Sequence, residues 1–270
     1  MLLVGGLVEI TGSEAPSALS RVCPASRWLI PNPEYYLMPV TAVTNGLLEK
    51  LPHDVCTELL SRCEKIDLVF GETLIESGQG YRHVYFPLRG FISKISVMNG
   101  RAALETGLVG LEGMLGATLA LGVGSAPTRA MVQGAGTALR MEEGVFTELL
   151  ATHPELRWVV MHYLHVMIEQ LAQTSACTRY HVVESRLARW LMMTGDRAGS
   201  DSFFITQEFI ATMLGVRRVG VTHAAGELQR LGLIHYSRGK LRILDRRGLL
   251  AASCSCYDAD CEVYARTMSL

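Results

Sequence analysis

The sequence predicts an α+β protein: an antiparallel β-barrel or roll, a long helix, and a C-terminal winged helix-turn-helix. Short runs of alternating apolar residues, cut by glycines, fill the region from Lys65 to Gly110. A long helical pattern opens at Pro154, a residue that is tolerated at the first position of a helix. Between Thr206 and Leu244 the pattern is a short helix, a glycine turn, a basic helix and a hairpin.

Length and composition favour a two-domain protein that is neither secreted nor membrane-bound. The 270 residues are 49% hydrophobic, enough for two cores, and no apolar run is long enough to span a bilayer. The N-terminal stretch MLLVGGLVEI contains Glu9 and lacks a basic start, so we expect no signal peptide. Seven scattered cysteines, an odd number, favour reduced thiols and hence a cytoplasmic protein.

The first 42 residues carry five prolines and little periodicity, which predicts a loosely structured arm. Short helical patterns follow Asn45, and another covers Glu142 to Leu150. The domains that we expect are an N-terminal arm (1–42), the β-roll (43–152), the long helix (153–180), the winged helix-turn-helix (181–257) and a C-terminal tail (258–270).

The expected strands are short and half apolar. Apolar residues alternate with others in two runs, Val84 to Leu88 and Phe91 to Val97. Turn glycines recur about every ten residues, at Gly71, Gly80, Gly90, Gly100 and Gly110. Many short strands with glycine turns are typical of an antiparallel barrel or roll.

The long helix carries a seam with 4-3-4-3-4 spacing, which suits a two-stranded coiled coil. We expect a dimer through Val160, Leu164, Met167 and Leu171, with Thr174 and Thr178 at its weaker end. A helix packed on its own barrel is the alternative, because six positions are few for a heptad assignment.

Residues 206–231 predict two helices joined by a glycine turn. Thr206 caps the first helix, Glu208 places negative charge in its first turn, and Gly215 ends it through the left-handed conformation. Gly232 ends the second helix, whose inner face we assign to Val216, Val219, Ala224, Leu228 and Leu231.

The outer face of the second helix is polar and basic, and a hairpin with a cationic tip follows it. Such a helix can enter the DNA major groove, and such a wing can lie beside the phosphate backbone. The alternative is a helical hairpin used only for packing. The residues that we expect at DNA are Thr206, Gln207, Arg217, Arg218, Thr222, His223, Arg238, Lys240 and Arg242.

Charge is divided unevenly along the chain, although the total is only −1. Residues 181–257 hold 11 Lys and Arg against 6 Asp and Glu, a net of +5, whereas residues 1–180 have a net of −4. One basic module attached to an acidic one is the distribution expected when only one part meets phosphates.

These features resemble the Crp/Fnr family of bacterial transcription regulators, over about residues 45–257. The most specific segments are ESRLARWL and ITQEFIATMLGVRRVGVTHAAGELQRLGLI, while VYFPLRGFISKI and GLEGMLG resemble the sensory roll of the family. The resemblance implies a double-stranded β-helix of the cyclic-nucleotide-binding-like type and no enzymatic activity. It also implies a homodimer that binds a two-fold symmetric operator in double-stranded DNA and contacts RNA polymerase.

Within the expected recognition helix, Arg218 matches the guanine-contacting arginine of the family. Val219 replaces the usual glutamate, and His223 stands where an arginine is common. The resemblance therefore implies an operator that differs from the consensus of the cyclic-AMP receptors.

The segment that matches the family's phosphate-binding cassette departs from it. Gly113–Met114 follows Glu112 where a leucine is usual, Thr128 replaces the phosphate-binding arginine, and Arg129 comes one residue later, on the opposite face of a strand. Leu171–Ala172 replaces the hydroxyls that meet the purine. We expect an altered or lost cyclic-nucleotide site, the alternative being a true cyclic-nucleotide-responsive regulator with an effector not identified by the sequence. The residues of a possible ligand pocket are Gly110, Glu112, Gly113, Met114, Thr128 and Arg129.

No cofactor or metal is predicted. An iron–sulfur cluster of the Fnr kind needs N-terminal cysteines, and that region offers only Cys23. Cys254, Cys256 and Cys261 could hold a soft metal, but a fourth ligand is missing, and buried thiols on a terminal turn are the preferred interpretation. Histidines that could ligate haem stand alone on amphipathic elements, which favours structural roles. They are His83, His162 and His165.

Two other classes of protein are disfavoured. A cupin-like metal enzyme would need a cluster of His and carboxylate ligands, and the roll offers only His83. A sensor that does not bind DNA would have no use for the cations gathered on one module. Those cations are Arg217, Arg218, Arg238, Lys240 and Arg242.

Overall fold

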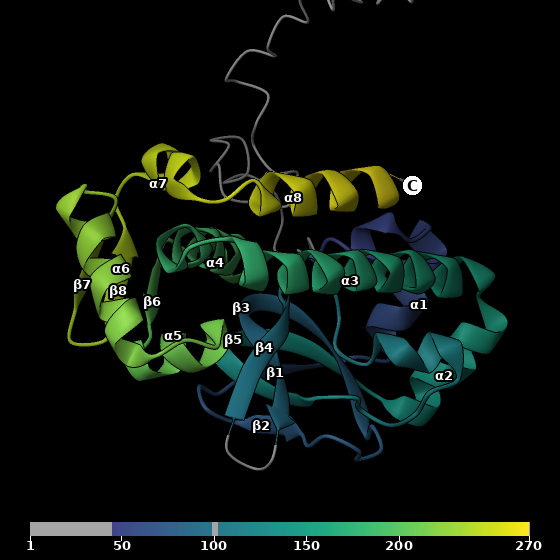
Figure 1. Cartoon of the computed structure of the whole chain (residues 1–270). Helices are drawn as coiled ribbons and strands as arrows, with labels where there is room; N and C mark the ends of the chain where they lie inside the picture. Colours follow the sequence, from purple (N-terminus) through teal and green to yellow (C-terminus); the bar gives the residue numbers. More distant parts are fainter. Residues whose placement is uncertain (1–44, 99–101, 270) are drawn as a thin grey trace, which may run out of the picture.

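The computed structural model describes residues 45–98 and 102–269, and it arranges them as the α+β architecture that the sequence predicts. A β-roll lies beneath a long helix, and the winged helix-turn-helix sits at one end of that helix (Figure 1). The expected N-terminal arm, with Cys23, and the expected turn at Gly100 lie outside the described residues.

The roll is a five-stranded antiparallel sheet in the order β1-β5-β3-β4, with β2 paired to β5. Its long central strands, β3 and β5, pair over most of their length and curl around the core. The strands are β1 (Glu64–Leu68), β2 (Thr73–Ile75), β3 (His83–Met98), β4 (Ala102–Val109) and β5 (Arg129–Glu142).

Gly90 bends a strand and does not end one, which corrects the predicted turn. Its φ of 77° lies in the left-handed region, and a Cβ there would stand 2.2 Å from the carbonyl oxygen of Gly134. Pairing with β5 continues on both sides, through Arg89 and Phe91. The two alternating runs are therefore one bent strand, because glycine permits the close crossing of backbones that would otherwise break it.

The core of the roll is closed by short helices at its ends. Phe86 of β3 and Phe146 of α2 are both fully buried and meet edge to face, with ring centroids 6.1 Å apart. These covering helices are η4 (Leu48–Lys50), α1 (His53–Ser61), η5 (Ala117–Leu121) and α2 (Glu143–Thr152).

Helix α3 (Pro154–Tyr180) starts at the predicted proline and packs on the roll of its own chain. Val160 is fully buried there and Leu164 is 7% exposed, so neither can face a second molecule. Their assignment to a dimer seam is wrong, and the alternative of a helix packed on its own barrel describes them. Met167 is partly buried and Leu171 is exposed.

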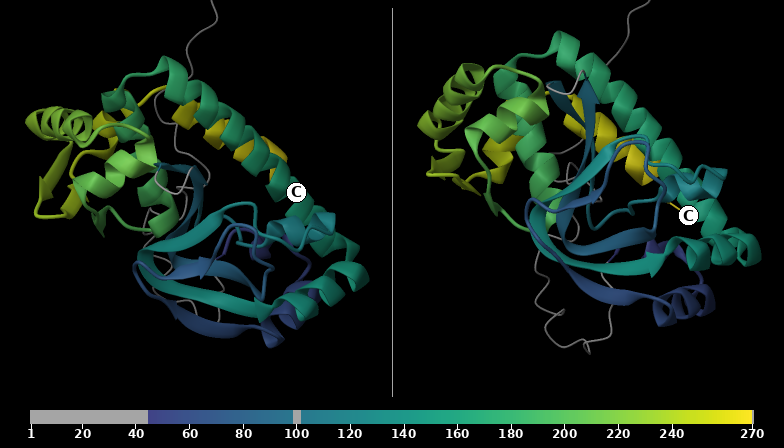
Figure 2. Two further views of the ribbon diagram at one scale, coloured as in Figure 1. Left: turned by 60° about the horizontal axis from the view of Figure 1, so that its bottom comes forward. Right: turned by 90° about the horizontal axis from the view of Figure 1, so that it is seen from below.

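The winged helix-turn-helix follows α4 (Val183–Ala198). Its core is continuous with the roll, because Ile95 of β3 is buried in the same cluster as α4, α5 and α6. Figure 2 shows α5 beside the strands of the roll and α6 with its wing at the outer end. The elements are β6 (Ser202–Phe204), α5 (Gln207–Leu214), α6 (Arg218–Arg230), β7 (Ile234–Ser237) and β8 (Lys240–Ile243).

The C-terminal segment is a structured element, although the sequence indicated only a tail over 258–270. After α7 (Arg246–Ala252), α8 (Cys256–Thr267) runs alongside α3 (Figures 1 and 2). Asp260 and Tyr264 are buried in this contact. Within the described ranges, none of the helices combines the length and apolar character needed to cross a bilayer.

Candidate nucleic-acid interface and the roll

Helix α5 begins and ends as its capping residues predict. The Oγ1 of Thr206 accepts a hydrogen bond from the backbone N–H of Phe209, 3.2 Å away. Gly215 ends the helix with a φ of 63°, and the backbone N–H of Val216 donates to the carbonyl of Ala211. The turn places Arg217 at the N-cap of α6.

The inner face of α6 differs in phase from the prediction. Val219 is 58% exposed and Leu231 is 51% exposed, so both assignments to the inner face are wrong. Val219 lies five residues before the buried Ala224, which at 3.6 residues per turn places the two side chains about 140° apart around the helix. Leu231 is the C-cap residue and follows the last turn of the helix. The buried residues of α6 are Val221, Ala224, Ala225 and Leu228.

The outer face of α6 presents the predicted polar and basic side chains. Arg217, Arg218, Thr222 and His223 are all exposed. The Oγ1 of Thr222 donates to Oε1 of Gln207 at 2.8 Å, which joins this face to the first turn of α5. The two helices therefore present one continuous surface.

The wing is a tight hairpin, and the backbone N–H of Tyr236 on β7 donates to Oε1 of Gln229 on α6 at 2.7 Å. Arg238 and Gly239 both have positive φ, 48° and 80°, which is the geometry of a type I′ turn. Lys240 and Arg242 point outward on β8, while Leu241 between them is buried. Strand β6, which the sequence did not predict, pairs with β8 on its other side.

The cations of this surface contrast with three other arginines of the same domain. Arg189, Arg197 and Arg246 are buried or half-buried and pair with Asp260, Glu112 and Asp196. By contrast, the exposed cations make no ion pair with any residue in the described part of the chain, which leaves their charge available to an anionic partner. They are Arg217, Arg218, Arg238, Lys240 and Arg242.

Most of the predicted ligand-pocket segment is filled by the chain's own side chains. A Cβ on Gly113 would lie 2.1 Å from the ring of Tyr163, and one on Gly110 would lie 2.4 Å from the Cβ of Arg197. Met114 is 1% exposed. These close approaches leave no room for a ligand against the three residues.

Glu112, the cassette-like glutamate, is engaged by the winged helix-turn-helix domain. Its Oε1 accepts from Nε of Arg197 on α4 at 2.9 Å, and both side chains are less than a tenth exposed. The phenolic O–H of Tyr264 on α8 donates to the backbone carbonyl of Glu112 at 2.9 Å. Sequence reasoning missed this contact, because nothing local marks Arg197 as a partner of the roll.

The other two predicted pocket residues lie at the start of β5. Nε of Arg129 donates to Oε2 of Glu76 at 2.7 Å, and the backbone of Arg129 pairs with that of Ile95. Thr128 precedes it and is partly exposed. The guanidinium of Arg129, which would have to bind the phosphate of a ligand, is thus paired with the carboxylate of Glu76.

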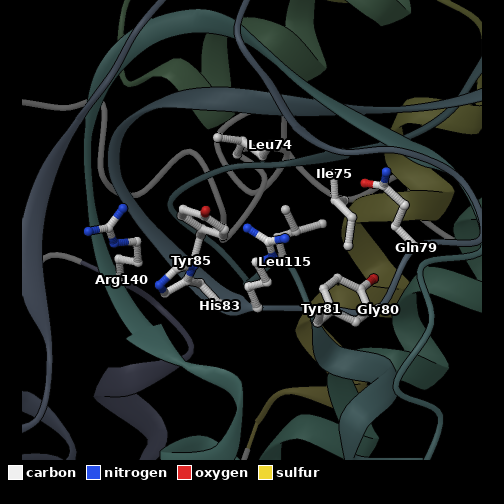
Figure 3. Close-up of a pocket in the computed structure, with 10 residues that line it drawn as sticks. Leu74, Ile75, Gln79, Gly80, Tyr81, His83, Tyr85, Leu115 and Arg140 are labelled. Carbon is white, nitrogen blue, oxygen red and sulfur yellow. The ribbon is translucent and has the colours of Figure 1, made fainter.

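A separate cavity of about 630 Å³ opens in the roll, away from these residues. Figure 3 shows its polar side chains, which include the imidazole of His83 and the guanidinium of Arg140. None of the six predicted pocket residues lines it. The lining residues are Leu74, Ile75, Gln79, Gly80, Tyr81, Arg82, His83, Tyr85, Leu115 and Arg140.

A second buried carboxylate also links the roll to α4. The indole N–H of Trp190 donates to Oε1 of Glu105 at 2.7 Å, and Oγ of Ser93 donates to Oε2 at 2.5 Å. Burial raises the pKa of Glu105 to about 7. The roll and the helix-turn-helix domain are therefore joined by the contacts of two buried carboxylates, Glu112 and Glu105, as well as by a shared apolar core.

Comparison with known proteins assigns this architecture. Residues 185–252 match the Crp-like helix-turn-helix domain, whereas no curated protein matches the sequence. The fold matches CLP of Xanthomonas campestris, a c-di-GMP-responsive global regulator, with a TM-score of 0.58 and 13% identity over 71% of this chain and 99% of CLP.

Two further structures share the fold. FixK2 of Bradyrhizobium japonicum has a TM-score of 0.58 and 12% identity over 71% of this chain and 98% of its own. A Crp/Fnr-family regulator from Eubacterium rectale has a TM-score of 0.57 and 15% identity, over 76% of this chain and 96% of its own. The chain thus carries a Crp-like helix-turn-helix domain on the fold of the Crp/Fnr family of transcriptional regulators.

Proposed function

We propose that this protein is a transcription regulator that binds a two-fold symmetric operator in double-stranded DNA as a homodimer. The observation that carries the proposal is the set of exposed, unpaired cations on α6 and the wing, on a domain of the Crp-like helix-turn-helix type. Such cations release counterions from phosphates on binding, and an arginine can also pair with guanine. A cupin-like enzyme is disfavoured, because the one cluster of metal-ligating type among the described residues lies outside the roll.

In this proposal the first turns of α6 read bases and the wing positions the domain. Arg218 and Thr222 face outward from α6, while Lys240 and Arg242 project from β8. Val219 is also exposed, beside Arg218, where an apolar side chain can contact the methyl group of thymine but cannot accept from cytosine.

Arg218→Ala is expected to reduce specific binding without an equal loss of non-specific binding, because a bidentate arginine–guanine pair contributes about 1–3 kcal/mol of discrimination. Lys240→Ala should instead weaken all sequences alike and lower the salt slope by about one unit. The measurement is fluorescence anisotropy on an operator obtained by genome-wide binding and on a scrambled duplex, over a range of salt.

The matched control is Arg266→Ala, which removes an exposed arginine from α8, far along the chain from the helix-turn-helix. It should leave both affinities unchanged. An Arg218→Ala protein that still prefers the operator as strongly as the wild type would refute this docking of α6.

The dimer, in this proposal, forms through a different face of α3 from the one that the sequence indicated. Trp158, Met161 and Ile168 are large apolar side chains that are 49%, 46% and 63% exposed, and His165 and Ala172 are exposed between and beyond them. Their spacing of 3-4-3-4 is that of a coiled-coil seam, displaced by one residue from the predicted one. An uncovered apolar stripe on a long helix is a surface that a second copy would bury.

The roll, we further propose, has lost the cyclic-AMP site of the family. In the segment that matches the phosphate-binding cassette, side chains of the same chain take the place of a ligand. Arg197 pairs with Glu112, and Tyr163 packs against Gly113. Glu76 pairs with Arg129.

The 630 Å³ cavity is instead the place for a small effector that carries negative charge, because its wall includes Arg82, which makes no ion pair with the described residues. The other arginine of the wall, Arg140, is paired with Glu64 at 2.6 Å, so an effector would have to compete for it. A contact with RNA polymerase remains an expectation from the family.

Calorimetric titration of the purified protein with cyclic AMP and cyclic GMP is expected to show no micromolar binding. A buried phosphodiester needs an arginine or a nest of amides, and Arg129 is held by Glu76. Micromolar binding that disappears in Arg129→Ala would restore the cyclic-nucleotide interpretation of the cassette. Binding that survives Arg129→Ala and disappears in Arg140→Ala would also contradict the expected lack of binding, but it would place the nucleotide in the cavity.

A further inference from the structure

Three thiols and one imidazole converge where α3 ends and α8 begins. Cys177 lies in the last turn of α3, His181 directly follows that helix, Cys254 precedes α8, and Cys256 is its first residue. One ligand atom from each residue lies within 4.8 Å of all the others. The fold therefore brings together two pairs of residues that are more than seventy positions apart in the sequence.

Two of the distances within this cluster are close to those of a tetrahedral metal site, and the others are no longer than 4.8 Å. The Sγ atoms of Cys177 and Cys254 are 3.5 Å apart, and Sγ of Cys256 is 3.4 Å from Nδ1 of His181. Around a tetrahedral zinc ion, with Zn–S near 2.3 Å and Zn–N near 2.0–2.1 Å, neighbouring ligand atoms stand about 3.4–3.8 Å apart. The two sulfurs are too far apart for a disulfide, whose bond length is about 2.05 Å.

The cysteines are not explained as part of the apolar cores. Cys177, Cys254 and Cys256 are each no more than 7% exposed and form a small buried cluster of their own. His181 is partly exposed, which provides a route from solvent to the cluster. Buried sulfurs that face one another and an imidazole are the donor set that soft divalent metals prefer.

The thiols already interact as a group. The Sγ atoms of Cys177 and Cys254 lie within hydrogen-bonding distance of each other, and so do Sγ of Cys256 and Nδ1 of His181. Deprotonated thiols are the form in which cysteines bind metals, and the four side chains already face one another.

We propose that Cys177, His181, Cys254 and Cys256 form a zinc site of the Cys3His type. Four protein ligands close the coordination sphere, so the site is structural and not catalytic. The expectation of no metal rested on a missing fourth ligand in the segment 254–261, and the structure supplies two ligands from the end of α3. Cys261, the third cysteine of that segment, is not among the four.

The site would fasten α8 to α3 at the junction of the two domains. From α8, Asp260 accepts from Nη2 of Arg189 at 2.6 Å, and Tyr264 binds the backbone of Glu112. Arg189 and Arg197 both belong to α4, so the position of α8 bears on the contacts between the roll and the helix-turn-helix domain. Zinc would hold this junction together, since it binds the folded arrangement and not the unfolded chain.

The test is a cobalt and zinc titration of the full-length protein, made metal-free with a chelator under reducing conditions. We expect one Co²⁺ per chain, with thiolate-to-cobalt charge transfer and the intense visible absorption of tetrahedral cobalt. One equivalent of Zn²⁺ should displace it and raise the Tm. Cys177→Ser and Cys254→Ser should lose the cobalt spectrum, while the matched control Cys63→Ser, at a free cysteine after α1, should keep it.

Three results would overturn the proposal: no stoichiometric cobalt spectrum in the wild type, an unchanged spectrum in Cys254→Ser, or a Cys177–Cys254 disulfide in peptides from the non-reduced protein. If the serine variants fail to fold, His181→Gln replaces them, because the partly exposed His181 side chain can be changed without opening the buried cluster. Its circular dichroism should match the wild type, and its zinc affinity should fall at least tenfold. An unchanged zinc affinity in a folded His181→Gln protein would exclude histidine from the site and overturn the Cys3His assignment.

Discussion

Arg197→Met is expected to lower the free energy of unfolding by about 3–5 kcal/mol, because it leaves the carboxylate of Glu112 buried without its counter-charge. The two side chains are 7% and 6% exposed, and Nε of Arg197 donates to Oε1 of Glu112 at 2.9 Å. Met retains most of the volume of the arginine stem, so the loss reports the charge and not a cavity. Urea unfolding followed by circular dichroism at fixed protein concentration measures it.

Two further variants separate the ion pair from simple packing. The double variant Glu112→Leu/Arg197→Met removes both charges and should regain most of the loss, because apolar replacements of buried pairs are often neutral or stabilising. Arg230→Ala removes one member of a fully exposed pair with Glu227 and should change stability little. If Arg197→Met and Arg230→Ala were equally mild, the Glu112–Arg197 pair would not be a buried ionic contact.

The same pair explains why the roll could not be interpreted from sequence alone. Glu112 matches a ligand-binding glutamate by its local sequence, but its partner lies 85 residues later, on α4. A carboxylate in a glycine-rich turn has the same sequence pattern whether it meets a ligand or an arginine of its own chain. Contacts between residues far apart in the sequence decide whether the carboxylate meets a ligand or an arginine, and a local sequence pattern does not reveal such contacts.

The helix-turn-helix was predictable because its signals are local. Thr206 caps α5 through an atom three residues away, and Gly215 and Gly239 have the positive φ that glycine favours. The errors at Val219 and Leu231 arose from the helical phase, because Val219 is five residues from Ala224, a spacing that does not keep two side chains on one helix face, and Leu231 lies at the C-cap.

The cysteine cluster, in contrast to the helix-turn-helix, depends on residues that are far apart in the sequence. Cys254 and Cys256 are separated by one residue, so the sequence analysis identified them as possible metal ligands, but a third thiol of the cluster, Cys177, lies 77 residues before Cys254. Cys177 and His181 have the spacing of one helical turn, a spacing that any two polar residues can share. Only the packing of α8 on α3 places the four residues together.

The dimer seam on α3 was difficult to predict for a related reason, because this helix is apolar on two adjacent faces. The face that contains Val160 and Leu164 packs on the roll, and the next face, with Met161 and Ile168, is exposed. The apolar residues of both faces recur at near-heptad spacing. The sequence pattern alone therefore does not show which of the two neighbouring faces packs on the roll. Of the predicted seam, Val160 and Leu164 pack on the roll, whereas Leu171 is exposed.

Ile168→Glu is expected to convert the proposed homodimer to monomers, raising the dimer Kd by about two to three powers of ten. In the single chain Ile168 is 63% exposed, so the substitution should leave the fold of each chain intact. In a coiled-coil dimer the two glutamates would face each other without a counter-charge, and a cost of about 3–4 kcal/mol for the pair corresponds to this change in Kd. Sedimentation velocity over a range of concentrations measures the change.

The proposed seam also predicts how two other variants behave. Val69→Glu introduces the same charge at an exposed valine between β1 and β2, 60% exposed, and should leave the dimer unchanged. Leu164→Ala, in the buried face, should lower the Tm of the chain without a comparable change in dimer Kd, since Leu164 packs on the roll. A dimer that survives Ile168→Glu but dissociates in Val69→Glu would move the interface from α3 to the roll. Loss of the α3 dimer should also abolish cooperative occupation of the two half-sites, because each monomer then binds its half-site independently.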